Sequence, residues 1–147
     1  MDRSAAVGLT AVAGGLIALQ APVNSTLGRA VGTLQAAFVS FAIGTAALLV
    51  LAALARGGLG AIADGRHVAW YSLAGGVLGA AYVTTALVTV RSLGAGGVTA
   101  ATIAGQLATA VVVDHFGLLG VERQPVTALR LVGIALLAGG VFLVVRD

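Results

Sequence analysis

Residues 104–120 read AGQLATAVVVDHFGLLG, and this stretch decides the class of fold. Most of it is apolar enough to lie in lipid, yet it contains Gln106 and, eight residues later, Asp114 followed by His115. Eight residues are a little over two turns of an α-helix, so Gln106 and Asp114 share one helix face. Such polar groups need partners inside the protein, because lipid offers none. The stretch predicts a membrane helix with a polar stripe.

The composition of the whole chain also indicates a membrane protein. Of its 147 residues, 59% are hydrophobic and only 9% are charged, and the mean hydropathy is +1.08. A soluble domain is about 25% charged, so this chain has too little polar surface to cover itself in water. The net charge of +3 comes from arginines spread over predicted loops, which is typical of a topology signal rather than of a nucleic-acid surface.

The residue types also bear on catalysis and metal binding. The chain contains no cysteine, and its two histidines have no companion cluster of metal-ligating residues. We therefore expect no disulfide, no metal site and no cofactor. No pairing of a nucleophile with a base is visible, so the sequence does not favour an enzyme.

Five stretches are long and apolar enough to cross a membrane, for which about 20 residues are needed. They are residues 4–27, 33–55, 68–90, 94–118 and 125–145. The connections between them are short, so consecutive helices should be antiparallel neighbours. The longest connection, 56–67, has the glycine and charge content of a solvated loop. We expect an all-α membrane protein with five transmembrane helices in a single domain, residues 1–147.

Small residues recur at intervals of four on two of these predicted helices. Gly75 and Gly79 lie on the third, and Gly97 and Gly105 lie eight apart on the fourth with Ala101 between them. This spacing lets helix backbones approach closely in a membrane. The glycines are interpreted either as plain packing positions or as places where helices bend or slide during transport.

Polar side chains at membrane depth are candidates for function. Five of them form the predicted substrate-binding set: Gln20, Asn24, Ser40, Tyr82 and Gln106. Gln20 and Asn24 are one helical turn apart with Pro22 between them, so they either share a cavity or mark a helix end. The hydroxyl of Ser40 can also bond back to its own helix. Gln106 needs a partner, which favours a cavity-facing role.

Charged residues are expected at the end of the fourth helix rather than in the middle of any helix. Asp114 is either interfacial or paired with Arg130, and we predict an Asp114–Arg130 ion pair that closes one end of the bundle as a gate or structural element. No Asp or Glu lies in the middle of a predicted helix. This argues against exchange of cationic drugs for protons and leaves neutral, zwitterionic or anionic substrates, or passive conduction.

Several segments together resemble a known family. They are ALQAPVNSTLGR at 18–29, AAFVSFAIGT at 36–45, GGVLGAAYV at 75–83, LGA at 93–95, AGQ at 104–106 and DHFGLLG at 114–120, together with the spacing of Arg130, Gly133 and Gly140. This pattern resembles the YdcZ-like inner-membrane exporters, a branch of the drug/metabolite transporter superfamily related to small multidrug resistance transporters. The resemblance implies a bacterial inner-membrane protein of about five helices. Residue by residue, it points to Gln20, Asn24, Ser40, Tyr82, Gln106, Asp114 and Arg130. The first-helix glutamate of small multidrug transporters has no counterpart here.

The arginine distribution bears on the assembly. With five spans, five arginines fall on the side of the N-terminus and three on the other, and so weak an asymmetry predicts insertion in both orientations. Many transporters are inverted repeats around a midplane site, which predicts an antiparallel homodimer or a pairing with an oppositely oriented paralogue. The predicted function is export of a small molecule by alternating access. The alternatives are a passive ion or small-solute channel and a non-transporting membrane subunit.

Overall fold

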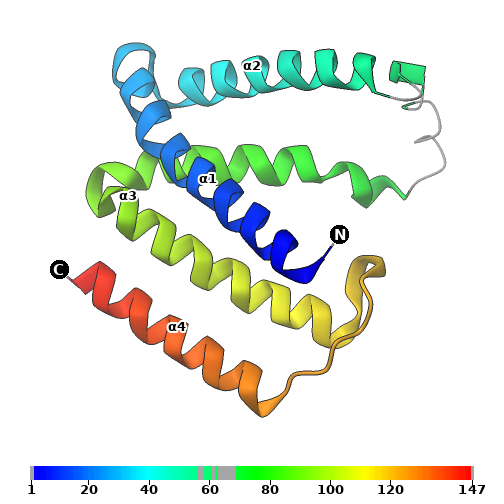
Figure 1. Cartoon of the computed structure of the whole chain (residues 1–147). Helices are drawn as coiled ribbons and strands as arrows, with labels where there is room; N and C mark the ends of the chain where they lie inside the picture. The colour runs from blue at the N-terminus through cyan, green and yellow to red at the C-terminus, as the bar shows by residue number, and fades with distance from the viewer. Residues whose placement is uncertain (1, 56–57, 61, 63–68, 147) are drawn as a thin grey trace. The chain divides into compact units, whose positions relative to one another are not determined.

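The computed structural model describes residues 2–55, 58–60, 62 and 69–146, and over these residues it is helical with no strand. The long helices are α1 (Arg3–Val31), α2 (Thr33–Leu54), α3 (Gly75–Phe116) and α4 (Ala128–Arg146), with short 3-10 helices η2 (Trp70–Leu73) and η3 (Leu118–Gly120) (Figure 1). The all-α prediction is confirmed. The predicted loop 56–67 lies mostly outside the described residues.

Four candidate membrane spans occur among the described residues, against five predicted stretches. They are Arg3–Val31, Thr33–Leu54, Tyr71–Phe116 and Ala128–Arg146. The third covers 46 residues, and α3 within it contains a non-helical residue, Gly94, with φ 67° and ψ 172°. Glycine adopts such a conformation at little cost. Gly94 is the first residue of the predicted stretch 94–118, close to the boundary with the stretch 68–90. The count of five crossings stays a prediction.

Contacts divide the chain into two compact units, Met1–Arg91 and Ser92–Asp147. The division falls inside α3, three residues before Gly94. Each unit is described by itself below. The expectation of a single five-helix domain stays a prediction.

In the first unit, α1 and α2 are joined by one residue, Gly32. Its φ is 98°, a conformation that L side chains rarely adopt, and its N–H donates to the carbonyl oxygen of Gly28 at 3.0 Å. Figure 1 shows the two helices meeting at this turn and diverging from it. α1 passes through Pro22 and continues to Val31, four residues beyond the predicted end. The interpretation of Gln20 and Asn24 as a helix end is therefore wrong.

The core of the first unit lies where α1, α2 and the first part of α3 meet. Its buried residues are Ala36, Ala37, Val83 and Leu87, against which Leu27 and Tyr82 pack. A Cβ added to the buried Gly28 would lie 3.7 Å from both Ala36 Cβ and Leu87 Cδ2. Small residues at this crossing let the helices approach closely, as they do in other membrane proteins.

The predicted packing glycines differ in what surrounds them. A Cβ added to Gly79 would lie 3.4 Å from Cζ of Phe41 on α2, so this glycine does allow a close approach of two helices. A Cβ added to Gly97 would lie 3.1 Å from Leu93 Cβ, on the same helix. Among the described residues, nothing lies within 4 Å of such a Cβ at Gly75 or Gly105.

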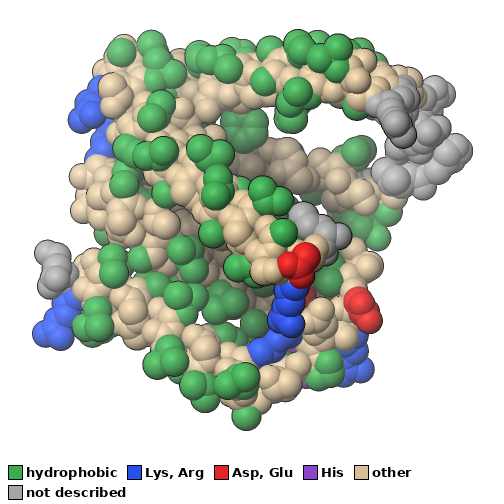
Figure 2. Space-filling view, viewed as in Figure 1, with side chains coloured by type: hydrophobic (Ala, Val, Ile, Leu, Met, Phe, Trp, Pro, Cys, Tyr) green, Lys and Arg blue, Asp and Glu red, His purple; other side chains and the backbone are tan. Residues whose placement is uncertain are grey.

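The second unit consists of the remainder of α3, a connecting loop and α4. Residues 121–127 are non-helical, so α4 begins at Ala128 and not at residue 125, and Pro125 lies before the helix. No residue of α4 is buried. Large apolar side chains on both units are exposed, for example Phe38 at 73% and Leu129 at 83%. Figure 2 shows hydrophobic side chains at many places on the visible surface. Such a surface suits lipid and not water.

Candidate functional site

A partly buried hydrogen bond joins two of the predicted site residues. Asn24 Nδ2 on α1 donates to Ser40 Oγ on α2 at 3.1 Å, and only 6% of Asn24 is exposed. Each residue lies eight positions from Gly32, a little over two helical turns from the turn that joins α1 and α2. The polar pair sits beside the apolar core, where an amide without a partner would be costly. The Ser40 hydroxyl therefore contacts another helix, contrary to the interpretation that it bonds its own backbone.

Gln20 and Tyr82 lie close to this pair. Gln20, Asn24 and Tyr82 line one small cavity between α1 and α3, together with apolar side chains such as Leu87. Its volume of about 10 Å³ is enough for about one water molecule. Four of the five predicted substrate-binding residues thus lie together in the first unit.

A second cavity opens between α1 and α2. It has a volume of about 200 Å³ and is lined by Gln20, Ser40, Phe41, Gly44, Thr45 and Leu48. Gln20 lines both cavities, and the Asn24–Ser40 hydrogen bond joins a residue of one cavity to a residue of the other. The polar lining groups are amides and hydroxyls, with no ionised side chain. Such groups can orient a solute by hydrogen bonds but cannot balance a charge.

The fifth predicted residue, Gln106, belongs to the second unit. It lies on the second part of α3, and its side chain is exposed. The predicted cavity-facing role of Gln106 stays a prediction.

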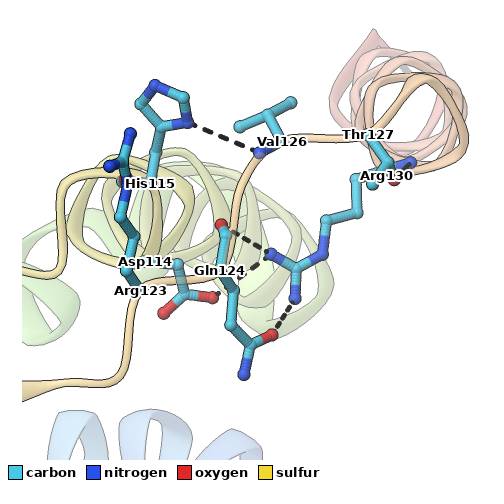
Figure 3. Close-up of polar contacts among 7 residues, drawn as sticks. All are labelled: Asp114, His115, Arg123, Gln124, Val126, Thr127 and Arg130. Atoms are coloured by element: carbon cyan, nitrogen blue, oxygen red, sulfur yellow. Dashed lines mark hydrogen bonds and ion pairs between the residues drawn. The ribbon is translucent and has the colours of Figure 1, made fainter.

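The predicted charged pair, Asp114 and Arg130, also belongs to the second unit. Arg130 Nη1 lies 3.6 Å from Asp114 Oδ2, and the two side chains are 37% and 30% exposed. This distance is longer than the 2.7–3.2 Å of a good N–H···O hydrogen bond, so the contact is a loose ion pair. Arg130 also donates to Gln124, from Nη1 to the carbonyl oxygen at 3.4 Å and from Nη2 to Oε1 (Figure 3). A gating role for the pair stays a prediction.

The loop around this pair is tied to the end of α3. Gln124 N–H donates to the Asp114 carbonyl oxygen at 2.8 Å, and Arg123 Nε donates to the His115 carbonyl oxygen at 2.9 Å. The N–H of Val126 donates to His115 Nδ1 at 3.4 Å (Figure 3). Gly117, with φ 64°, ends the helix in the left-handed conformation that commonly follows a helix C-terminus. The loop therefore supplies partners that the last turn of a helix lacks.

Comparison with known families identifies the chain. The model of the family described as "Putative inner membrane exporter, YdcZ" matches residues 5–143. The chain belongs to the YdcZ family. The predicted resemblance is confirmed, and membership of the YdcZ family together with the apolar helices makes the protein a multi-pass membrane protein of an exporter family. No curated protein and no solved structure matches the chain.

Two residues of the sites described above were not among the predicted site residues of this YdcZ-family chain. Thr45 lines the cavity that contains Ser40, and its spacing of five residues from Ser40 gave a weak signal because five residues span almost one and a half helical turns. Gln124 lies in a loop, where an amide is ordinary, and only the fold of that loop brings it to Arg130.

Proposed function

We propose that this YdcZ-family chain transports a small, uncharged solute with hydrogen-bonding groups across the bacterial inner membrane, by alternating access at a midplane site. The observation that carries the proposal is Asn24. A primary amide has two donors and two acceptor lone pairs, and among the described residues this buried side chain makes one hydrogen bond, to Ser40. Asn24 also lines the small cavity of the first unit, so its remaining hydrogen-bonding capacity could serve a solute there.

The absence of charge in the lining of these cavities supports an uncharged substrate. The polar groups are contributed by Gln20, Asn24, Ser40, Thr45 and Tyr82. Taking an ion out of water requires an opposite charge or a metal, and neither cavity is lined by one. A solute that carries amide, hydroxyl or carbonyl groups could instead exchange its bonds to water for bonds to these side chains.

The sizes of the cavities support alternating access with a second subunit. Ligand pockets usually measure about 300 to 1,000 Å³. The two cavities of the first unit measure about 10 and 200 Å³. A solute therefore needs a rearrangement of the helices or a second subunit that enlarges the site. We propose that the chain crosses the membrane five times and that α3 crosses once before Gly94 and once after it. We also propose an inverted partner, which is either a second copy of this chain or a paralogue.

A flux experiment in proteoliposomes tests the transport proposal. Purified protein is offered a panel of neutral, cationic and anionic solutes of similar size. We expect neutral polar solutes to move, and Gln20→Leu to slow them strongly because Gln20 lines both cavities. Its side chain is exposed, so the substitution should disturb the packing of the helices little. Thr10→Val is the matched control, since among the described residues Thr10 Oγ1 bonds only to the carbonyl oxygen of Ala6 on its own helix.

Three results would contradict this proposal. Selective movement of ions alone would remove the argument from the uncharged lining. Rates far above about a thousand per second would indicate a passive channel. A lack of flux for every class, with Gln20→Leu indistinguishable from the parent, would indicate a non-transporting subunit.

One labelling experiment tests both the crossings and the orientation. A double variant carries Gly60→Cys and Glu122→Cys, and an impermeant thiol reagent is applied from one side of the membrane. Mass spectrometry of the intact chain then gives the number of labels on each molecule. If α3 crosses twice, both cysteines lie on one side, so each molecule gains two labels or none. If α3 crosses once, every molecule gains one. Two populations, doubly labelled and unlabelled, are expected for a dual-topology homodimer; a single population would require a paralogue as the inverted partner.

A further inference from the structure

A cavity of the second unit, separate from the proposed transport site, combines an apolar wall with a charged mouth. Its volume is about 340 Å³, and it lies between α3 and α4. The lining residues are Leu107, Ala110, Val111, Asp114, Arg130, Gly133 and Ile134. Five of these seven are apolar or lack a side chain, and the two charged residues are the loose ion pair described above.

The charged mouth lies at one end of both helices. Asp114 is two residues before the end of α3 at Phe116, and Arg130 is the third residue of α4. The ends of helices long enough to cross a membrane lie near the lipid headgroups. The apolar part of the cavity, with Leu107 and Ile134, therefore continues from headgroup level toward the hydrocarbon.

The charged groups retain capacity to bind a ligand. Their contact is 3.6 Å long, and both side chains are about one-third exposed. Among the described residues, Asp114 Oδ1 and Arg130 Nε make no hydrogen bond, while Gln124 holds the guanidinium group from the other side. The contacts of the loop with the end of α3 keep the two charges in place, so a ligand would meet a site that is already arranged.

The signs of the two charges select the ligand. An anionic headgroup would bond to Arg130 but would be repelled by Asp114. A cationic headgroup would bond to Asp114 but would be repelled by Arg130. A headgroup that carries both a phosphate and an ammonium can contact both residues. Guanidinium groups bind phosphate by paired, charge-assisted hydrogen bonds, and an ammonium is a donor to carboxylate.

We infer that the cavity between α3 and α4 binds one zwitterionic phospholipid with a primary ammonium, its phosphate on Arg130, its ammonium on Asp114 and an acyl chain against Leu107 and Ile134. Access from the bilayer is open, because no residue of α4 is buried. The inference concerns the second unit and holds whatever solute is transported.

Native mass spectrometry of the full-length protein tests this inference. The protein is given phosphatidylethanolamine and phosphatidylglycerol with identical acyl chains, and separately soluble phosphoethanolamine. We expect one phosphatidylethanolamine to be retained per chain, about tenfold more tightly than phosphatidylglycerol, as for the loss of a hydrogen bond to a charged group. Phosphoethanolamine should not bind at matched concentration, since it lacks the acyl chain.

Matched variants separate the apolar and the charged parts of the site. Nothing lies within 4 Å of a Cβ added to Gly133, so Gly133→Leu should fill the cavity without distorting the helices and should reduce retention about tenfold. Gly139→Leu is the control, because Gly139 is equally open and does not line the cavity. Asp114→Asn should remove the headgroup preference, because the phosphate that Arg130 binds is common to both lipids. Arg130→Gln should weaken the retention of both lipids, whereas Arg29→Gln, which removes a cation elsewhere, should not.

Several outcomes would overturn the inference. Equal retention of the two lipids by the parent protein would show that Asp114 does not bind the ammonium group. Unchanged retention of the lipid in Gly133→Leu would show that the lipid does not bind in this cavity. If Gly133→Leu altered only the proportion of dimer, the surface would be an interface between protein chains. Binding of phosphoethanolamine as tight as that of the lipid would remove the acyl chain from the site.

Discussion

The two units treat polar side chains in opposite ways. In the first unit, only 6% of Asn24 is exposed, and its amide bonds to the hydroxyl of Ser40 on the next helix. In the second unit, Asp114 and Arg130 are charged, stay about one-third exposed and lie at helix ends. Neutral groups can be satisfied by one another inside an apolar bundle. Full charges are held where water and headgroups are available, because their desolvation costs more.

The packing of the units differs in the same direction. Three helical segments of the first unit enclose a small core around Leu87, whereas α4 in the second unit has no buried residue. The stability of the packed first unit depends on how closely its side chains fit together. The stability of the second unit depends more on the lipid or protein that lies against it. Substitutions should therefore cost most in the core of the first unit and least at the charged pair of the second.

The largest effect is expected at Leu87, which is 1% exposed. Leu87→Ala should destabilise the protein by about 2–5 kcal/mol, because the removed atoms leave a cavity at the junction of three helical segments. The control is Val88→Ala, whose parent side chain is 59% exposed. The measurement is the unfolding midpoint in mild detergent. Equal shifts for the two variants would mean that the first unit has no rigid core.

The second effect tests the break in α3, near the division between the units. Gly94→Ala should cost about 1–3 kcal/mol, because a side chain is strained at φ 67° and ψ 172°. Gly96→Ala is the control, since Gly96 is helical and nothing lies within 4 Å of an added Cβ. Unfolding midpoints and one-sided labelling would be compared. A gain in stability for Gly94→Ala would indicate that α3 prefers to be continuous.

The third effect concerns the hydrogen bond between Asn24 and Ser40. In a double-mutant cycle of Asn24→Ala and Ser40→Ala, we expect a coupling energy of about 0.6 kcal/mol and no more than about 1.7 kcal/mol, as for hydrogen bonds between other membrane helices. Denaturant unfolding of the four proteins gives this value. Strict additivity of the two single changes would show that the 3.1 Å contact contributes nothing to stability.

The smallest effect is expected at the charged pair. Either Asp114→Arg or Arg130→Asp alone should destabilise the protein by no more than about 0.5 kcal/mol, because the pair is partly exposed and loose. The exchanged double variant should recover most of this loss in the same unfolding assay. A double variant less stable than both single ones would mean that Gln124 and the loop, not the opposite charges, determine which residue fits at each position.

Residue patterns predicted much of the secondary structure and of the polar cluster. Hydropathy and length alone located the helices, since an apolar segment of sufficient length has few alternatives in a membrane. The helical spacing of Gln20 and Asn24 placed both on one face, and they do line one cavity. Helix ends were less predictable: α1 extends past Pro22 to Val31, and α4 begins three residues later than expected, because ends depend on turns and capping contacts.

The sequence by itself determined that this chain is an all-helical membrane protein of the YdcZ family. Composition, segment length and the family's residue pattern carry that information, and they need no tertiary contact. Only the tertiary structure decided that Asn24 bonds to Ser40, that Gln20 and Tyr82 share a cavity, and that Gln124 joins Arg130 beside Asp114. These partners lie 6 to 62 residues apart in the chain, as the numbering shows, and no local periodicity specifies which distant faces meet.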